Sequence, residues 1–163
     1  MSVHTATVSW ALKPDEDFAR GRYSRAHTLA FDGGATAPGS ASPSVVPLPW
    51  SDPAGVDPEE LFVAALSSCH MLTFLDLARR AGFRITAYAD TAQGVMTKND
   101  HGAHWVSAVT LRPAITYEGP SPDAAAETAL HEAAHHACFI ANSVRTTVRV
   151  EPAILPSRQG QPV

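Results

Sequence analysis

The sequence predicts an α+β protein in which two helices pack against antiparallel strands. Three observations predict this class. The expected elements follow the order strand, strand, long loop, helix, strand, strand, helix, strand. A strong helix-start signal stands at Asp57, and residues 105–117 alternate between mostly apolar and polar side chains, as a half-buried strand does. Since this order implies few parallel crossovers, the sheet should be mainly antiparallel.

Two strands and a long loop are expected before Asp57. The strands are predicted over residues 3–12 and 22–31, with a polar turn between them at residues 14–17. Residues 33–57 are dense in Gly, Pro, Ala and Ser and have no helical or alternating period, which predicts a long loop. Loops of this length are uncommon in compact domains and are usually functional or held by a partner chain.

The clearest helix begins after Asp57. This residue stands in the N-cap position, Pro58 in the first helical position and Glu60 in the third, which resembles a capping box with Asp in the cap role. Apolar residues then recur at helical spacing over a wide surface: Leu61, Phe62, Ala65, Leu66, Cys69, Leu72 and Leu75. We therefore expect this central helix to be buried on most sides and to stop near Gly82.

The second half of the chain predicts a hairpin, a helix and a last strand. The hairpin joins residues 83–96 to residues 105–117 through the turn signal Asn-Asp-His-Gly at 99–102. The second helix is expected to open within Ser-Pro-Asp at residues 121–123 and to run to about Ala141.

The last strand is expected over residues 144–150, where Val alternates with polar residues. With no repeat and no charge block, the whole chain, residues 1–163, is expected to be one domain with a flexible tail at residues 154–163.

Composition and charge exclude several classes of protein. Apolar residues make up 45% of the chain and charged residues 17%, which is typical of a globular protein. A formal net charge of −4 supplies no basic surplus, which argues against a nucleic acid or an anionic membrane surface as partner. Polar residues interrupt the longest apolar stretch, residues 61–78, so a core helix is expected rather than a membrane span. The N-terminus lacks the features of a signal peptide, and a cytoplasmic location is expected.

One formal motif suggests metal chemistry. His131 and His135, with Glu132 between them, match the H-E-x-x-H pattern of zinc proteases, in which both His share one helix face. A catalytic zinc usually needs a third protein ligand, and the extended pattern fails because Cys138 and Ala141 stand where Gly and His are required. A metal-binding protein or zinc hydrolase using His131 and His135 remains an alternative.

The two cysteines suggest redox chemistry or buried thiols. Cys69 and Cys138 lie on apolar faces of the two expected helices, so side-by-side packing could bring the sulfurs within disulfide reach. Two inert buried thiols are the competing interpretation. Cys69 lies about three turns beyond Pro58, so the helix dipole adds little, and a thiolate there needs a cation. Candidate cations stand in the segment that holds Arg20, Arg22 and Arg25.

Two segments resemble the OsmC/Ohr family, which comprises osmotically inducible protein C and organic hydroperoxide resistance proteins. The first segment is Asp-Pro-Glu-Glu-Leu-Phe at residues 57–62, followed by Cys69. The second is Ala-His-His-Ala-Cys at residues 134–138. The order of strands and helices also matches over essentially the whole chain.

This resemblance implies a thiol-dependent peroxidase that acts on organic hydroperoxides, built as an intertwined homodimer with inter-subunit active sites and reduced by an external thiol or dithiol. It implies that Cys69 is the peroxidatic thiol and Cys138 the resolving thiol, with which it forms a disulfide. Glu59 would orient the catalytic arginine, for which we favour Arg25 over Arg20 and Arg22. No cofactor and no metal are implied.

Two positions depart from the family pattern. Phe139 follows the second Cys, where the family often has Pro, and His70 follows Cys69, where better-known members commonly have Phe. These changes bear on substrate choice and on the geometry of the resolving step. His70 could shuttle a proton or be an ordinary buried imidazole, and a non-catalytic dimer that binds a small ligand or senses oxidation is a further alternative. The role of the cluster formed by His131, His135 and His136 stays open.

Overall fold

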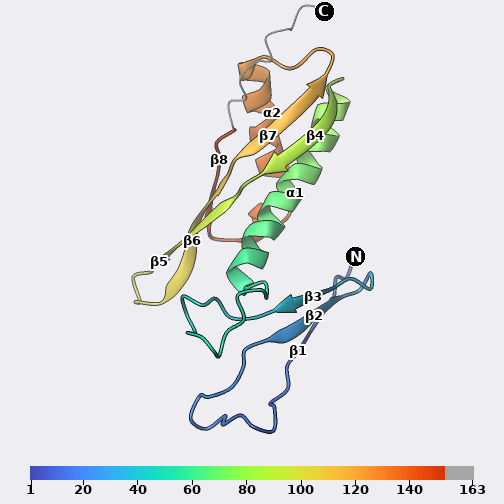
Figure 1. Cartoon of the computed structure of the whole chain (residues 1–163). Coiled ribbons are helices and arrows are strands. Elements are labelled where there is room, and N and C mark those ends of the chain that lie inside the picture. Colours follow the sequence, from blue (N-terminus) through green and yellow to red (C-terminus); the bar gives the residue numbers. More distant parts are fainter. Residues whose placement is uncertain (153–163) are drawn as a thin grey trace, which may run out of the picture. The chain divides into compact units, whose positions relative to one another are not determined.

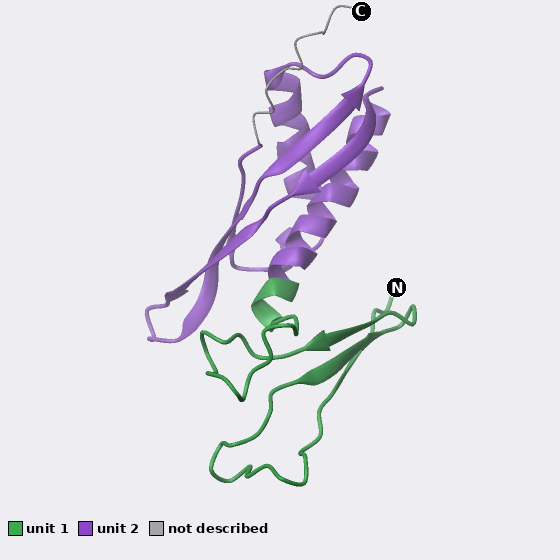
Figure 2. Cartoon of the chain, in the orientation of Figure 1, with its two compact units in different colours: residues 1–61 green, residues 62–163 purple. Residues whose placement is uncertain are grey.

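The computed structural model describes residues 1–152, which form two compact units (Figure 2). The N-terminal unit is Met1–Leu61, and the C-terminal unit begins at Phe62. The expected tail at residues 154–163 lies outside the described residues, and a single domain over the whole chain stays a prediction.

The N-terminal unit is a three-stranded antiparallel sheet in the order β1-β2-β3 (Figure 1). Its strands are β1 (Ala6–Ser9), β2 (His27–Phe31) and β3 (Thr36–Gly39). The two expected strands are therefore present but shorter. Strand β3 lies inside the segment that was expected to be loop, because Gly34, with φ at 86°, turns the chain back after Phe31.

The rest of the expected loop, residues 40–57, contains no helix or strand. Backbone hydrogen bonds hold its end beside β3: Ser40 donates to the Val56 carbonyl at 3.1 Å, and Val56 donates to the Pro38 carbonyl at 3.0 Å. The Asp52 amide donates to the buried Ser40 hydroxyl at 2.8 Å. These hydrogen bonds thus hold the end of the loop beside β3.

Helix α1 (Pro58–Arg80) begins as the sequence predicts. The Glu60 amide donates to the Asp57 carboxylate at 2.7 Å, and the Asp57 amide donates to the Glu60 carboxylate at 3.0 Å, which is a reciprocal capping box. At the other end, Gly82 has φ of 87° and ends the helix.

The expectation that this helix is buried on most sides is wrong for the single chain, because burial on α1 follows one stripe. Within one chain only Leu66, His70, Phe74 and Ala78 are buried, at every fourth residue, while Leu72 is 62% exposed. By length and composition α1 would also qualify to cross a membrane, with a mean hydropathy of 1.6, a test that core helices pass as well. Its buried side chains pack against strands and α2, as expected of a core helix.

The C-terminal unit contains the expected hairpin, bent into two segments. Strand β4 (Arg84–Asp90) pairs antiparallel with β7 (Pro113–Glu118), and β5 (Gln93–Lys98) pairs antiparallel with β6 (His104–Leu111). Each long predicted strand is broken where the Asp90 carboxylate accepts hydrogen bonds from the Ser67 hydroxyl and the Arg112 amide, at 2.5 and 2.6 Å.

The last strand, β8 (Thr147–Val150), pairs with β6 in parallel, which the predicted antiparallel order did not include. Helix α2 (Ala124–Ala137) starts directly after the predicted opening segment, with Asp123 as its N-cap, but it ends before Cys138 and not near Ala141. The Asn142 side chain ends the helix because its amide donates to the His136 and Cys138 carbonyls.

Helices α1 and α2 pack on the same side of β4 and β7 (Figure 1). One buried cluster joins the helices to this pair of strands: Phe74, Ala78, Ile115 and Ala134. A second cluster joins α1 to β6: Leu66, Val109 and Leu111. The two sulfur-bearing positions therefore belong to a well-packed unit.

Candidate active site

The two thiols meet inside the C-terminal unit. Cys69 projects from α1 and is half-buried, whereas Cys138, directly after α2, is 1% exposed, and both cysteines are free. Burial raises the pKa of the Cys138 thiol, and a hydrogen bond with Cys69 raises that pKa further. The packing of α1 and α2 thus brings together the two sulfurs that the sequence places far apart.

The backbone around Cys138 holds its thiol in place. The Ala141 amide donates to the Cys138 sulfur at 3.4 Å, and the Cys138 amide donates to the His135 carbonyl at 3.3 Å. Cys138 caps the carboxyl end of α2, where the partial negative charge of the helix disfavours an anion. The two thiols are therefore unequal: Cys69 is the more accessible, and the surroundings of Cys138 raise the pKa of its thiol.

Arg25 and Glu59 lie in the N-terminal unit. The Arg25 guanidinium donates to the Gly21 carbonyl at 3.0 Å and to the Tyr23 carbonyl, and it stands 3.7 Å from the centre of the Tyr23 ring. Glu59 is half-buried in the first turn of α1. Within residues 1–152 neither Arg25 nor Glu59 forms an ion pair, so the structure does not join these two residues to the thiols.

The other two candidate arginines are less constrained. Arg22 is exposed, and Arg20 is exposed and pairs with Asp17 at 3.5 Å. Arg25 is thus the one arginine of the three whose guanidinium is half-buried and held by backbone carbonyls.

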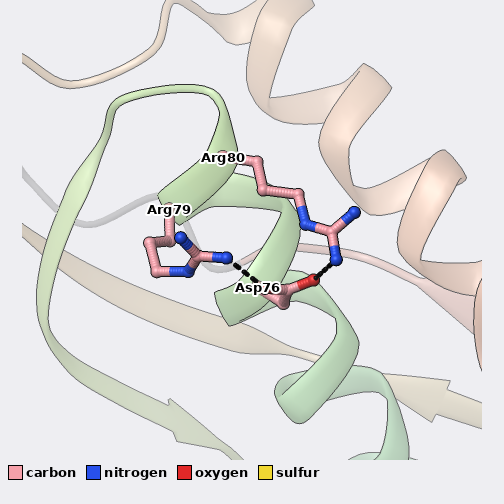
Figure 3. A network of polar contacts seen from close by, with 3 residues as sticks. All are labelled: Asp76, Arg79 and Arg80. Atoms are coloured by element: carbon pink, nitrogen blue, oxygen red, sulfur yellow. Dashed lines mark hydrogen bonds and ion pairs between the residues drawn. The ribbon is translucent and has the colours of Figure 1, made fainter.

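The arginines on the helix of Cys69 have another role. Arg79 and Arg80 both pair with Asp76 at 2.8 Å on the exposed last turns of α1 (Figure 3). Arg79 and Arg80 stand at the carboxyl end of the helix, where positive charge is favourable. They lie about three turns beyond Cys69 and cannot serve its thiol.

A buried pair of histidines was missed by sequence reasoning. His70 Nε2 lies 3.1 Å from His131 Nδ1, and the His131 ring stacks on Phe74 with centroids 4.3 Å apart. Burial, and next the charge of His135, lowers the pKa of His70 to about 4. Burial, and next His70, lowers the pKa of His131 to about 4. Both rings are therefore neutral near pH 7.

The His70–His131 pair argues against a metal site at the H-E-x-x-H motif. One His131 nitrogen is engaged by His70, and Glu132 is exposed. In the part of the chain that the structure describes, no group of three or more His, Cys, Asp or Glu is arranged to hold a metal ion. The metal-site hypothesis thus finds no ligand set there. The missed signal was the apolar stripe of α1, in which His70 stands one turn from Leu66 and from Phe74.

Comparison with known proteins gives one family. A family model described as OsmC-like protein matches residues 51–153. A solved OsmC-like protein of unknown function from Vibrio cholerae is 49% identical, with a TM-score of 0.91 over 94% of this chain and 100% of that chain. A search of curated proteins finds no match.

Two more distant solved structures share the fold. The organic hydroperoxide resistance protein of Elizabethkingia anophelis is 19% identical, with a TM-score of 0.67 over 93% of this chain and 94% of that chain. The organic hydroperoxide resistance protein OhrB of Bacillus subtilis is 19% identical, with a TM-score of 0.68 over 93% of this chain and 98% of that chain.

Proposed function

This chain belongs to the OsmC-like protein family, and we propose that it is a thiol-dependent peroxidase that reduces organic hydroperoxides. The observation that carries the proposal is the contact between the Cys69 and Cys138 thiols across α1 and α2. Two distant relatives are named organic hydroperoxide resistance proteins, which supports this chemistry by analogy of fold.

The proposed reaction uses both sulfurs. The Cys69 thiolate attacks the terminal oxygen of the hydroperoxide, the O–O bond breaks, and the leaving alkoxide takes a proton and departs as an alcohol. Cys69 is then a sulfenic acid. The Cys138 sulfur attacks the Cys69 sulfur, which forms a disulfide and releases water. An external dithiol returns two electrons and two protons and restores both thiols.

The unequal environments of the thiols support these roles. Cys69 is the more accessible sulfur, as an attacking thiolate requires, and the raised pKa of Cys138 keeps that thiol protonated until the sulfenic acid forms. A reversal of roles would require the thiolate to form at the carboxyl end of a helix, where it is disfavoured.

Arg25 is proposed to stabilise the Cys69 thiolate and the charge that develops on the leaving oxygen, and Glu59 to orient Arg25. Glu59 and Cys69 are about 15 Å apart along one straight helix, since each residue rises about 1.5 Å. Glu59 can therefore complete the site most simply from a second copy of the chain. This argument supports an intertwined homodimer with inter-subunit sites. We also propose a cytoplasmic location and an external thiol or dithiol as reductant.

Exposed apolar side chains next to the thiols in sequence suit an apolar substrate. Phe139 follows Cys138 and is 83% exposed, and Leu72, one turn beyond Cys69, is 62% exposed in the single chain. Such side chains favour the alkyl or aryl part of an organic hydroperoxide over hydrogen peroxide.

The test is consumption of cumene hydroperoxide with dithiothreitol as reductant. Cys69→Ser should lose at least about a thousandfold in kcat/KM, because the nucleophile is removed. Cys138→Ser should still form a sulfenic acid, which a sulfenic-acid-specific reagent traps, but should turn over slowly. The neighbouring exposed Ser68→Ala should react as the wild type. Equal rates for Cys69→Ser and wild type would remove Cys69 from the mechanism.

A redox sensor is the second candidate, since the same two free thiols suffice to form one disulfide without turnover. A sensor would form the Cys69–Cys138 disulfide once per peroxide and would not turn over with small thiols or with thioredoxin. Stopped-flow measurement of disulfide formation, followed by multiple-turnover assays, separates the two functions.

A further inference from the structure

Residues 138–143 form a turn that follows α2 and holds the buried Cys138 thiol in one place. Within it Ala141–Ser143 form a short 3-10 helix, and the Asn142 backbone amide donates to the Cys138 carbonyl at 3.1 Å. No proline stands at residues 139–151, so no ring restricts the backbone after the cysteine. Hydrogen bonds must therefore set the direction in which Cys138 points.

The exposed side chain of Asn142 joins this turn to the end of α2. Its amide nitrogen donates to the His136 carbonyl at 2.8 Å and to the Cys138 carbonyl at 2.9 Å. A carboxamide group has two N–H donors, and both are used here. Because one bond reaches the last turn of α2 and the other reaches the cysteine itself, Asn142 fixes the Cys138 peptide relative to the helix.

The chain leaves the helical direction at the cysteine. Cys138 has φ of −70° and ψ of 115°, which is an extended conformation. In this conformation the Ala141 amide donates to the Cys138 sulfur at 3.4 Å, and Cys69 on α1 hydrogen-bonds with the same sulfur. The Cys138 sulfur is thus held between an amide of its own turn and the thiol with which it would react.

This arrangement suits the step that forms the disulfide. In that step the Cys138 sulfur bonds to the Cys69 sulfur, the S–O bond of the sulfenic acid breaks, and the Cys138 proton departs with the hydroxyl group as water. The attacking sulfur gains negative charge as its proton departs. Burial raises the pKa of the Cys138 thiol, whereas the amides of Ala141 and Ile140 lower it. These two amides therefore favour the charge that the step develops.

We propose that Asn142 is a positioning residue for the disulfide-forming step: it holds the Cys138 peptide against the end of α2 and so keeps the Cys138 sulfur beside Cys69 and the Ala141 amide. Both donors of Asn142 bond to carbonyl oxygens and neither bonds to a sulfur, so Asn142 acts through the backbone of Cys138. This role rests on the proposed function, but it concerns the bond between the two sulfurs and not the attack on peroxide.

A probe that needs no peroxide isolates this step. The aryl disulfide dithiobis(nitrobenzoate) forms a mixed disulfide with the more accessible Cys69 and releases one thionitrobenzoate. Cys138 then attacks the Cys69 sulfur, which forms the protein disulfide and releases a second thionitrobenzoate. Stopped-flow absorbance of thionitrobenzoate, with the full-length protein, gives the rates of both releases.

Two substitutions remove the hydrogen bonds of Asn142. Asn142→Ala shortens the side chain, and Asn142→Asp keeps its shape but lacks the N–H donors. Each should slow the second release at least about tenfold, because the Cys138 sulfur is no longer held beside Cys69. Each should change the first release less than about twofold, since that reaction uses Cys69 alone.

Two control variants separate positioning from a loss of stability. Ser143→Ala removes a bond of the same kind in the same turn, in which the Ser143 hydroxyl donates to the Phe139 carbonyl at 2.8 Å. Asp123→Ala removes the cap at the other end of α2 and should lower the free energy of unfolding by about 1 kcal/mol. Both variants should show the second release within about twofold of the wild-type rate.

Three results would overturn this role of Asn142: a slowing of the second release by less than about tenfold in either Asn142 variant, an equal slowing in Asp123→Ala, or a wild type that releases a single thionitrobenzoate. Consumption of cumene hydroperoxide tests the proposed function separately. A wild type that releases two thionitrobenzoates but consumes no peroxide would refute the peroxidase, while slowed Asn142 variants would still support the positioning role.

Discussion

The two units differ sharply in how much they bury. In the N-terminal unit Leu29 is the single buried large apolar side chain among the described residues, and Trp10, Phe18 and Leu48 are 41%, 58% and 63% exposed. The C-terminal unit has two apolar clusters between helices and strands. The unit with the core carries the two sulfurs of the proposed reaction, and the unit without one carries the proposed catalytic arginine. Hydrophobic stabilisation of the N-terminal unit must therefore come from surface outside that unit.

The largest expected effect on stability comes from truncating one buried apolar side chain in each unit. Phe74→Ala should lower the free energy of unfolding by about 3–5 kcal/mol, because Phe74 is fully buried against Ile115 and Ala134. Leu29→Ala should lower it by about 2 kcal/mol, since fewer buried neighbours surround Leu29. Urea unfolding followed by circular dichroism measures both. A larger loss for Leu29→Ala would contradict the contrast between the units.

The next effect tests whether the N-terminal unit serves the thiols. Arg25→Met should lower kcat/KM for cumene hydroperoxide at least about a hundredfold, equivalent to about 2.7 kcal/mol, because it removes the positive charge proposed to stabilise the thiolate. Arg22→Met, the same change at an exposed arginine nearby, should change it less than about twofold. Similar losses in both variants would show a general electrostatic effect and not a role for Arg25.

A further effect concerns pH and the histidine pair of the C-terminal unit. His70 and His131 have pKa values of about 4 in the folded chain, below the ordinary value of 6.5. Between pH 6.5 and pH 4 the unfolded chain binds protons that the folded chain does not, so stability falls as the pH falls through this window and levels off below it. At about 1.4 kcal/mol for each unit of pKa, the loss should be up to about 3 kcal/mol for each imidazole.

Urea midpoints at pH 7 and pH 4.5 measure this loss. His70→Phe should reduce the difference between the two pH values, because one buried imidazole is removed, whereas His101→Ala at an exposed turn should leave it unchanged. An unaltered pH difference in His70→Phe would contradict the assignment.

The smallest expected effect on stability comes from removing the N-cap residue of each helix. Asp57→Ala removes a reciprocal capping box in the N-terminal unit, and Asp123→Ala removes a single cap in the C-terminal unit, where the Ala126 amide donates to the carboxylate at 2.8 Å. Each should lower stability by about 1 kcal/mol, because each substitution removes one carboxylate that accepts from a helix amide, while the backbone amide of residue 57 still donates to Glu60 in Asp57→Ala. Thermal unfolding midpoints resolve a difference of this size.

Local patterns explain which parts of the fold the sequence predicts. The capping box at Asp57 and the cap at Asp123 depend on residues three positions apart, so the helix starts were predicted correctly. The parallel pairing of β8 with β6 joins strands distant in sequence, and no local pattern encodes it. Strand β3 was missed because Gly and Pro dominate its neighbourhood.

The candidate site likewise has features that local sequence patterns predict and features that they do not. The nearness of Cys69 and Cys138 was one of two interpretations of the sequence, which placed both on apolar faces of the expected helices, although α2 ends before Cys138. The His70–His131 pair was not expected, because which residue of α2 faces His70 depends on the relative shift of the two helices. The roles of Arg25 and Glu59 stay predictions, since both stand outside the unit that holds the thiols.

The position of Cys138 at the end of α2 has a consequence for the oxidised protein. A covalent link from there to the middle of α1 would fasten the two core helices together and enclose both strand pairs within one ring of the chain. By loop-closure entropy, a ring of this size disfavours the unfolded ensemble by about 4 kcal/mol. The oxidation state of the protein would then set its melting temperature, so that a thermal-shift scan with and without peroxide would report the redox history of each sample.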